Sequence, residues 1–167
     1  MLNTRKAGTE DIPLIQSLSH TIWHEVYPGI VTVGQIEYML EMMYSSEALN
    51  IQMNEKRHVF LVLEWMGEAV GFVSYSINKP EDPLRYRIHK LYVQPSLHGK
   101  GIGKAAVQTV AENIAKKGGK QIELNVNKKN PAVGFYEKIG FYKEQELVVD
   151  IGNGYLMDDF IMVMDLP

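Results

Sequence analysis

The chain of 167 residues contains no cysteine. Disulfide bonds, thiolate metal ligands and a cysteine nucleophile are therefore excluded. Positive charge is not in excess either, because 17 Lys and Arg residues stand against 20 Asp and Glu residues and give a net charge of −3. Without a basic stripe along the chain, no nucleic-acid partner is expected.

Long apolar runs are also missing. No window approaches the length of a membrane-spanning helix, and Met1 to Gly8 lack the apolar core of a signal peptide. We therefore expect a cytoplasmic protein with no membrane partner. No repeat, linker or low-complexity tract divides the chain, and a hydrophobic content of 46% suffices for one core. Residues 1–167 are expected to form a single domain.

Residues 90–104 combine a strand-like run with a glycine-rich loop. The apolar run is stopped by Pro95, glycines follow at alternate positions 99, 101 and 103, and a helical pattern begins at Ile102. Glycine allows a bulky ligand to approach the main chain. The first N–H groups of a helix lack internal partners and attract an anion. This stretch therefore predicts a phosphate-binding loop between a strand and a helix.

Two nucleotide-binding motifs fit this loop poorly. A P-loop requires Ser or Thr after the Gly-Lys pair, but Ala105 follows here, and His98 stands where the upstream glycine is needed. A dinucleotide fingerprint needs its first glycine directly after the strand, whereas Pro95 to Lys100 intervene. A nicotinamide-dependent oxidoreductase is therefore the weaker alternative.

The remaining elements follow from periodicity and turn residues. Helices are expected from an N-cap at Thr9 to about residue 26, from the Thr32 capping box to Tyr44, over 46–53, over 102–116, and from the Asn130 N-cap to Gly140. Strands are expected over 2–6, 59–64, 69–77, 85–93, 121–126, 141–150 and 155–165. Turns are expected at Met66-Gly67 and around Gly152-Asn-Gly154, and a loop over 78–83.

Two motifs together resemble the GNAT superfamily of N-acetyltransferases. Val93-x-Pro95 followed by His98-Gly-Lys-Gly-Ile-Gly103 resembles the acetyl-coenzyme A loop [QR]-x-x-G-x-[GA], with His98 in place of Gln or Arg. Asn130 to Phe141 resembles the second hallmark, N-x-x-A-x-x-F-Y-x-x-x-G-F, with its alanine one place early at Ala132. The resemblance covers roughly residues 59–166.

This resemblance implies an α/β GNAT fold. Its sheet is mixed, mostly antiparallel and twisted, has about seven strands splayed at the middle, and is flanked by about four helices. Acetyl-coenzyme A is implied as co-substrate, with no metal. The backbone of Leu91 and Val93 would hold the pantetheine arm, together with Asn130, and Val93 would be an oxyanion donor. The pyrophosphate would rest on His98, Gly99, Lys100, Gly101, Ile102, Gly103 and Lys104.

The implied chemistry is direct acetyl transfer to an amine. An alkyl ammonium with a pKa near ~10.4 must first lose a proton to a base. By similarity, Tyr136 returns a proton to the departing thiolate. Many relatives carry an acid on the strand before the glycine loop, but residues 85–90 contain none here. The base is therefore left open between His89 and a carboxylate such as Glu25 acting through water.

The acceptor is expected to be a small amine. Trp23 to Tyr27 and the following helix resemble bacterial polyamine (spermidine and spermine) acetyltransferases, in which aromatic and acidic residues of the first helices bind the acceptor. Asp158 and Asp159 interrupt an apolar strand, so alternation turns one of them inward, where an acid suits a cationic amine. Solubility of a sheet edge is the other interpretation of this pair.

Several alternatives remain open at this point. A protein N-terminus or an aminoglycoside could be the acceptor, and a non-catalytic acyl-coenzyme A-binding module would carry the same loop. His20 and His24 have the spacing of a metal pair, but no third ligand pattern accompanies them, so no metal site is expected. A homodimer is left open.

Overall fold

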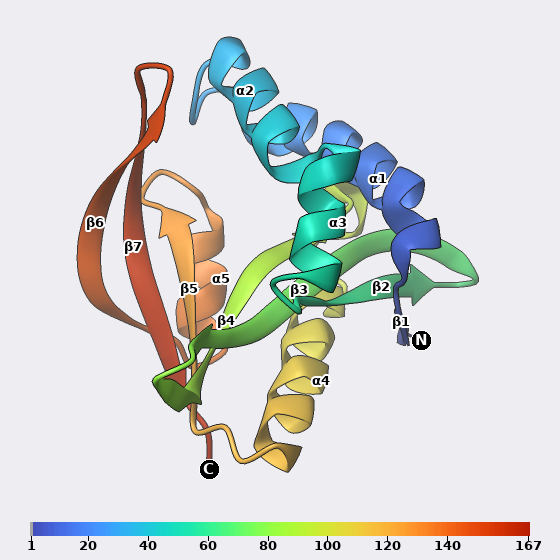
Figure 1. Ribbon diagram of the computed structural model, residues 1–167, viewed down its shortest axis with the longest axis vertical. Helices are drawn as coiled ribbons and strands as arrows, with labels where there is room; N and C mark the ends of the chain where they lie inside the picture. The colour runs from blue at the N-terminus through green and yellow to red at the C-terminus, as the bar shows by residue number, and fades with distance from the viewer. Residues whose placement is uncertain (1) are drawn as a thin grey trace. The chain divides into compact units, whose positions relative to one another are not determined.

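The computed structural model describes residues 2–167. The strands are β1 (Leu2–Lys6), β2 (Val59–Trp65), β3 (Glu68–Lys79), β4 (Asp82–Val93), β5 (Gln121–Asn127), β6 (Tyr142–Gly152) and β7 (Tyr155–Asp165). The helices are α1 (Ile12–Val26), α2 (Val33–Tyr44), α3 (Ser46–Asn54), α4 (Ile102–Lys116) and α5 (Ala132–Lys138), with short 3₁₀ turns η1 (Thr9–Asp11) and η2 (Pro95–Leu97). Figure 1 shows these elements in chain order.

The strands form a seven-stranded mixed sheet in the order β1-β2-β3-β4-β5-β7-β6. Pairing is antiparallel for β1 with β2, β2 with β3, β5 with β7 and β6 with β7. Strands β4 and β5 are parallel and are connected through α4, as a parallel pair requires a crossover segment. The predicted α/β fold with a mostly antiparallel sheet of seven strands is therefore confirmed.

Five α-helices are present among the described residues, in agreement with the five helical ranges expected from periodicity, whereas the family resemblance implied about four. The boundary expected between residues 44 and 46 lies at Ser45, which has extended backbone angles of −60° and 156° and ends α2. Its hydroxyl accepts a hydrogen bond from the backbone N–H of Ala48 and caps α3. One serine thus divides the helical stretch into two helices.

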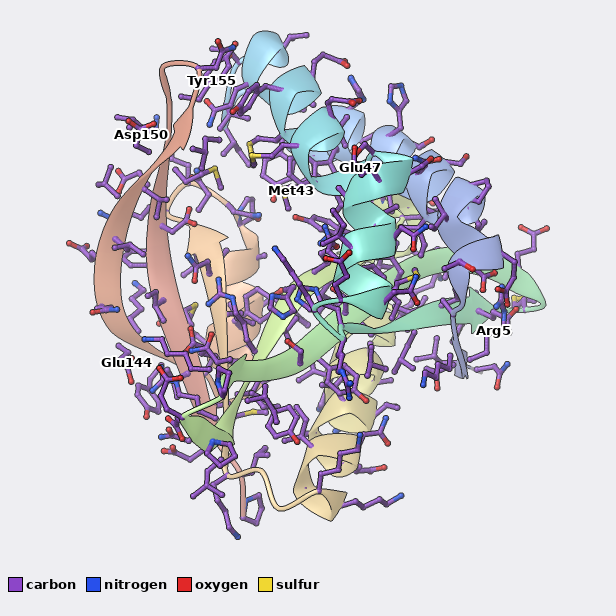
Figure 2. The ribbon with its side chains drawn as sticks, in the orientation of Figure 1. Arg5, Met43, Glu47, Glu144, Asp150 and Tyr155 are labelled. Atoms are coloured by element: carbon purple, nitrogen blue, oxygen red, sulfur yellow. The ribbon has the colours of Figure 1, made fainter. Side chains whose placement is uncertain are left out.

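Two tight hairpin turns were predicted and are confirmed. Met66 and Gly67 have φ angles of 52° and 83° between β2 and β3. Asn153 and Gly154 have φ angles of 53° and 78° between β6 and β7. Positive φ at both central residues defines the type I′ turn, whose twist matches that of paired strands. Asp150 and Tyr155 mark the turn end of the β6–β7 hairpin in Figure 2.

Other boundary predictions were wrong. Thr9 is not a helix N-cap but begins η1, because Asp11 uses its carboxylate to bind the Arg5 guanidinium at 2.8 Å and the Gly8 backbone N–H at 3.0 Å. The expected loop over 78–83 is shorter, because β3 continues to Lys79 and β4 starts at Asp82. Asn130 is not the N-cap of α5, a position that Pro131 takes.

The chain divides into two compact units. The first unit runs to Ser76 and resumes from His89 to Val110, and its core includes Trp23, Phe60 and Phe72. The second unit comprises Ile77–Ile88 and Ala111–Pro167, and its core includes Ile114, Ile122 and Met162. Within residues 2–167, no helix combines the length and apolar character needed to span a bilayer.

Candidate active site

The glycine loop begins where β4 ends, in the first unit. Gly99 and Gly101 have φ angles of 84° and 81°, in the region that residues with a side chain rarely adopt. A Cβ atom at either position would meet nothing within 4 Å, so the backbone conformation and not space requires glycine. Helix α4 follows from Ile102, which is buried and anchors the helix start. The main chain between these glycines is thus open to a ligand.

His98 ties this loop to the end of β4. Its Nε2 lies 2.9 Å from the carbonyl oxygen of Val93. Because a carbonyl only accepts, Nε2 of His98 carries the hydrogen of this bond. His98, which stands where the family motif has Gln or Arg, therefore contacts the main chain at the end of β4.

Gly71 on β3 controls how closely the two backbones approach at this point. A Cβ atom on Gly71 would overlap the carbonyl oxygen of Tyr92 and lie 3.0 Å from the Cα of Val93. The backbone N–H of Gln94 donates to the carbonyl of Val70 at 2.9 Å. Sequence analysis did not single out Gly71, although a lone glycine inside a strand pattern often marks such an approach.

His89, one of the candidate bases, is held on two sides. Its Nε2 lies 2.7 Å from the hydroxyl oxygen of Ser76, and its ring stacks on that of His58 at 3.8 Å. Burial, with the charges of Lys90 and Lys56, lowers the pKa of His58 to about 4. His58 is therefore a neutral ring against which His89 packs.

Lys90 is a functional candidate that sequence analysis missed. Its side chain is 4% exposed and its Nζ donates to Oε1 of Gln52 at 2.7 Å. The ammonium lies 5.3 Å from the ring centre of Tyr44 and 5.6 Å from that of Phe60. Burial, followed by the charge of Lys56, lowers the pKa of Lys90 to about 7. The alternation of β4 was the available signal, because the buried Ile88 stands two residues earlier on the same face.

The predicted acceptor residues Trp23 and Tyr27 belong to an aromatic cluster. Trp23 is 1% exposed, and its ring centre lies 4.4 Å from that of Tyr27 and 5.6 Å from that of Tyr92. The hydroxyls of Tyr27 and Tyr92 are 3.0 Å apart. The indole N–H of Trp23 and the hydroxyl of Tyr44 are buried without a hydrogen-bond partner. Burial raises the pKa of Tyr44 well above its usual value.

The other charged residues of α1 face away from this cluster. Glu25, the second candidate base, is exposed on α1. His24 binds the carboxylate of Glu37 through Nε2 at 2.7 Å, and hydrogen bonding to the carbonyl of His20 and to Glu37 raises the pKa of His24. Within the part of the chain that is described, no group of three or more His, Cys, Asp or Glu side chains could hold a metal ion.

In the second unit, the two neighbouring acids of β7 have opposite surroundings. Asp158 is exposed and binds Nζ of Lys128 at 2.9 Å. Asp159 is 3% exposed, and its Oδ2 accepts a long hydrogen bond of 3.4 Å from Nδ2 of Asn125. Its Oδ1 has no hydrogen-bond partner. Burial raises the pKa of Asp159.

A second buried acid, Glu123 on β5, is fully paired. Its Oε1 accepts from Nε of Arg85 and from Nδ2 of Asn78, both at 2.7 Å, and its Oε2 accepts from Nη1 of Arg87 at 2.6 Å. The other guanidinium nitrogen of Arg87 donates to Oδ1 of Asn125 at 2.6 Å. This network orients the asparagine that contacts Asp159.

Tyr136 and Asn130, from the second family motif, lie at α5. Tyr136 is buried, with its ring centre 5.1 Å from that of Phe135 and 5.4 Å from that of Phe141. Oδ1 of Asn130 accepts from the backbone N–H of Ala132 at 2.8 Å, which forms an Asx turn at the helix start. The amide nitrogen of Asn130 is then the side-chain donor available for a ligand.

Comparison with protein families and curated proteins gives a consistent result. The family model described as "Acetyltransferase (GNAT) domain" matches residues 30–154. A spermidine N(1)-acetyltransferase of Thermoplasma acidophilum is 28% identical over 167 residues, covering 96% of this chain and 95% of that protein. An uncharacterised N-acetyltransferase of Methanocaldococcus jannaschii is 37% identical over 93 residues, and the match spans only 41% of that protein.

Solved structures show the same fold. The PaiA N-acetyltransferase of Thermoplasma acidophilum, crystallised in complex with coenzyme A, is 25% identical, with a TM-score of 0.80 and coverage of 99% of both chains. A GCN5-related N-acetyltransferase from Rhodopseudomonas palustris is 19% identical, with a TM-score of 0.81, coverage of 98% of this chain and 95% of the other. The second likeness concerns the fold alone.

Proposed function

Since the chain belongs to the GNAT family of acetyl-coenzyme A-dependent N-acetyltransferases, we propose that its acceptor is a primary amine of a small molecule, with a polyamine favoured. The observation that carries this proposal is the similarity to a spermidine N(1)-acetyltransferase, which extends over 96% of the chain and so includes α1 and α2. These are the helices in which an acceptor-specific residue is expected.

The co-substrate fits the main chain after β4. Gly99 and Gly101 leave the backbone uncovered, and the start of α4 offers N–H groups and the positive end of the helix dipole. In the proposed complex, N–H groups from His98 to Lys104 hold the pyrophosphate. The backbone of Leu91 and Val93, with Asn130, holds the pantetheine arm.

The reaction has one bond to form and one to break. The amine nitrogen attacks the thioester carbonyl carbon, the C–N bond forms, and the C–S bond breaks. The backbone N–H of Val93 stabilises the developing oxyanion, and Tyr136 gives its proton to the leaving thiolate. His89 and Glu25 remain the bases named from sequence, the first bound to Ser76 and the second exposed.

Aromatic and acidic side chains suit a cationic acceptor. Trp23 and Tyr27 are aromatic, the side-chain type that attracts ammonium groups, and both lie in a buried cluster. Asp158 and Asp159 provide carboxylates, of which only Asp158 is already paired with a lysine. A polyamine carries several ammonium groups, and carboxylates and aromatic rings are the two side-chain types that bind such groups.

An acceptor panel tests the proposal. Release of free coenzyme A thiol is measured with spermidine, spermine, an aminoglycoside and a peptide bearing a free N-terminus. The proposal expects the highest kcat/KM for a polyamine. If the aminoglycoside or the peptide is preferred by tenfold or more, about 1.4 kcal/mol, the polyamine assignment is wrong while the family assignment stands.

Replacing Tyr136 with Phe separates an enzyme from a binding module. The variant should bind acetyl-coenzyme A unchanged and lose about 100-fold in kcat, the usual contribution of a general acid. Tyr142→Phe is the matched control, because Tyr142 is an exposed tyrosine on β6. Thermal shifts with acetyl-coenzyme A and with NAD distinguish the oxidoreductase alternative, since only a ligand of the native state raises Tm.

A further inference from the structure

The second unit contains a buried carboxylate that lacks a cation. Asp159 is 3% exposed, and its Oδ1 has no hydrogen-bond partner. Its one polar contact is the 3.4 Å hydrogen bond from Asn125 to Oδ2. A buried carboxylate is strongly disfavoured unless it is paired or protonated. A positive charge placed beside its carboxylate would therefore stabilise the ionised form.

The cationic side chains near Asp159 already bind other side chains. Arg87 gives one guanidinium nitrogen to Glu123 and another to Asn125, both at 2.6 Å. Lys128 lies 2.9 Å from Asp158 and 3.6 Å from Glu146. On β6, the residue paired with Asp159 is the apolar Leu147. The side chains that surround Asp159 thus leave it without an ion partner.

The contact that Asp159 does make is held rigidly. Asn125 donates to Asp159 through Nδ2 and accepts from Arg87 through Oδ1, which fixes the orientation of its amide. Glu123 in turn binds Arg87 through an ion pair of 2.6 Å, and the same carboxylate also binds Arg85 at 2.7 Å. This series of hydrogen bonds and ion pairs links side chains of β4, β5 and β7 and ends at Asp159. Such a network is expected around a side chain that must keep its position.

We propose that Asp159 binds the acceptor's ammonium group and is the general base that accepts its proton, with Asn125 as a positioning residue. This inference rests on the proposed N-acetyltransferase function. It assigns to Asp159 the role for which His89 and Glu25 were the alternatives, and it separates Asp159 from Asp158, which already pairs with Lys128.

The proton balance is complete without another reactant. The ammonium gives one proton to Asp159 and becomes a neutral amine, which attacks the thioester carbon. The thiolate takes the Tyr136 proton as the C–S bond breaks. The amide nitrogen gives its second proton to the Tyr136 phenolate, and Asp159 releases its proton to solvent. The sum is an ammonium and a thioester converted into an amide, a thiol and one proton.

The pH dependence follows from the same groups. Burial, the largest effect, and the neighbouring Asp158 raise the pKa of Asp159, while Asn125, Arg87 and Lys128 lower it. A base must be unprotonated to act, so kcat/KM should rise with pH through the pKa of Asp159. It should fall again where the free acceptor loses its proton, since the ammonium is the form that binds.

Asp159→Asn is the direct test, with Asp165→Asn, at an exposed acid of the same strand, as its control. Asparagine keeps the shape of Asp159 and removes its charge. The expected result is a loss of about 100-fold or more in kcat/KM for the best amine at pH 7, with an unchanged Kd for acetyl-coenzyme A. Asp165→Asn should change kcat/KM by less than about threefold, because its carboxylate is exposed.

Stability separates this role from a structural one. The pKa of Asp159 is raised in the folded state, so the native protein loses stability as pH rises from the unfolded value through the folded one. Asp159→Asn should therefore raise Tm at pH 7.5, by about 2 °C or more, and raise it less at pH 4. A side chain needed only for folding would lower Tm instead.

Asn125→Ala tests the positioning role. Loss of its hydrogen bond should move the acid limb of the kcat/KM profile to higher pH, because Asn125 lowers the pKa of Asp159. If the wild-type protein acetylates amines and Asp159→Asn keeps kcat/KM within threefold of wild type, the assignment of Asp159 is wrong while the proposed function stands. Wild-type protein that neither binds acetyl-coenzyme A nor releases thiol overturns the proposed function itself.

Discussion

Strand β4 passes through two different electrostatic environments. In its first half, Arg85 and Arg87 are bound by the buried carboxylate of Glu123, with Nε and Nη1 at 2.7 and 2.6 Å from its oxygens. In its second half, the ammonium of Lys90 is equally buried but has only an amide oxygen of Gln52 and two aromatic rings. The arginines contact a carboxylate, whereas the groups that contact the lysine ammonium are neutral and the charge of Lys56 acts on it as a second cation.

The difference shows how partner chemistry sets the state of a buried group. A charge that is paired and fully hydrogen-bonded tolerates burial, but breaking the pair leaves an uncompensated charge. A charge among neutral groups responds by shifting its pKa, as the value of about 7 for Lys90 shows. The same strand therefore carries permanently charged residues and one residue whose charge depends on pH.

Removing the acid of the first half should have the largest effect on stability. Glu123→Gln keeps the size of the side chain but leaves Arg87 without its ion pair and Arg85 with Glu144 alone. We expect a loss of about 3–5 kcal/mol in the free energy of unfolding, measured by urea denaturation at pH 7. A loss below 1 kcal/mol would contradict the importance of this pairing.

Replacing Lys90, in the second half of β4, should raise the free energy of unfolding instead of lowering it. Between about pH 7 and 10.5 the folded protein binds fewer protons at Lys90 than the unfolded chain, so wild-type stability rises with pH through this window. Lys90→Met should lack this rise and gain about 2 kcal/mol more over wild type at pH 6 than at pH 9. Equal gains at both pH values would show that Lys90 keeps an ordinary pKa.

The end of β4 offers a test of packing without charge. Gly71→Ala places a methyl group against the Tyr92 carbonyl, which should cost about 1–3 kcal/mol. Because the strand end at Val93 must shift, KM for acetyl-coenzyme A should also rise. Gly67→Ala is a control for a glycine with open space around it. An unchanged KM for Gly71→Ala would separate this contact from co-substrate binding.

The outer ion pair of the first half should matter least. Arg85 also binds Glu144, at 2.8 Å, but Glu144 is exposed on β6, as Figure 2 shows. Although Arg85 lowers the pKa of Glu144 through a hydrogen bond, solvent screens this pair. Glu144→Gln should therefore cost less than about 1 kcal/mol. If Glu144→Gln lowered the free energy of unfolding as much as Glu123→Gln, the buried pairs with Glu123 and the exposed pair with Glu144 would not differ in strength.

The fold could be predicted from the sequence to a large extent. Turn residues such as Asn153-Gly154 and the periodicity of 102–116 depend on local backbone preferences, and both elements occur as expected. Thr9 shows where this fails, because Asp11 is drawn to Arg5 on another element. A contact between segments overrides a capping preference of about 1 kcal/mol.

The candidate site could be predicted only in part. The glycines of the loop were identified from their pattern, and the assigned roles remain predictions. Asn125 carried no local signal that set it apart, and alternation along β4 marked Lys90 only as a residue on the same face as Ile88. Lys90 stands out through its contact with Gln52, and Asn125 through its contact with Arg87. The two residues of each pair are 38 positions apart along the chain. Pattern analysis does not contain that information.

By itself, the sequence determined the order of the elements, the family motifs and the residue types that can carry acetyl-transfer chemistry, because these depend on neighbours within a few positions. Only the tertiary structure decided that Asp159 and Lys90 are buried without an opposite charge while Glu123 is paired. Burial and ion pairing arise from the register of strands distant in sequence, and that register exists only once the chain has folded.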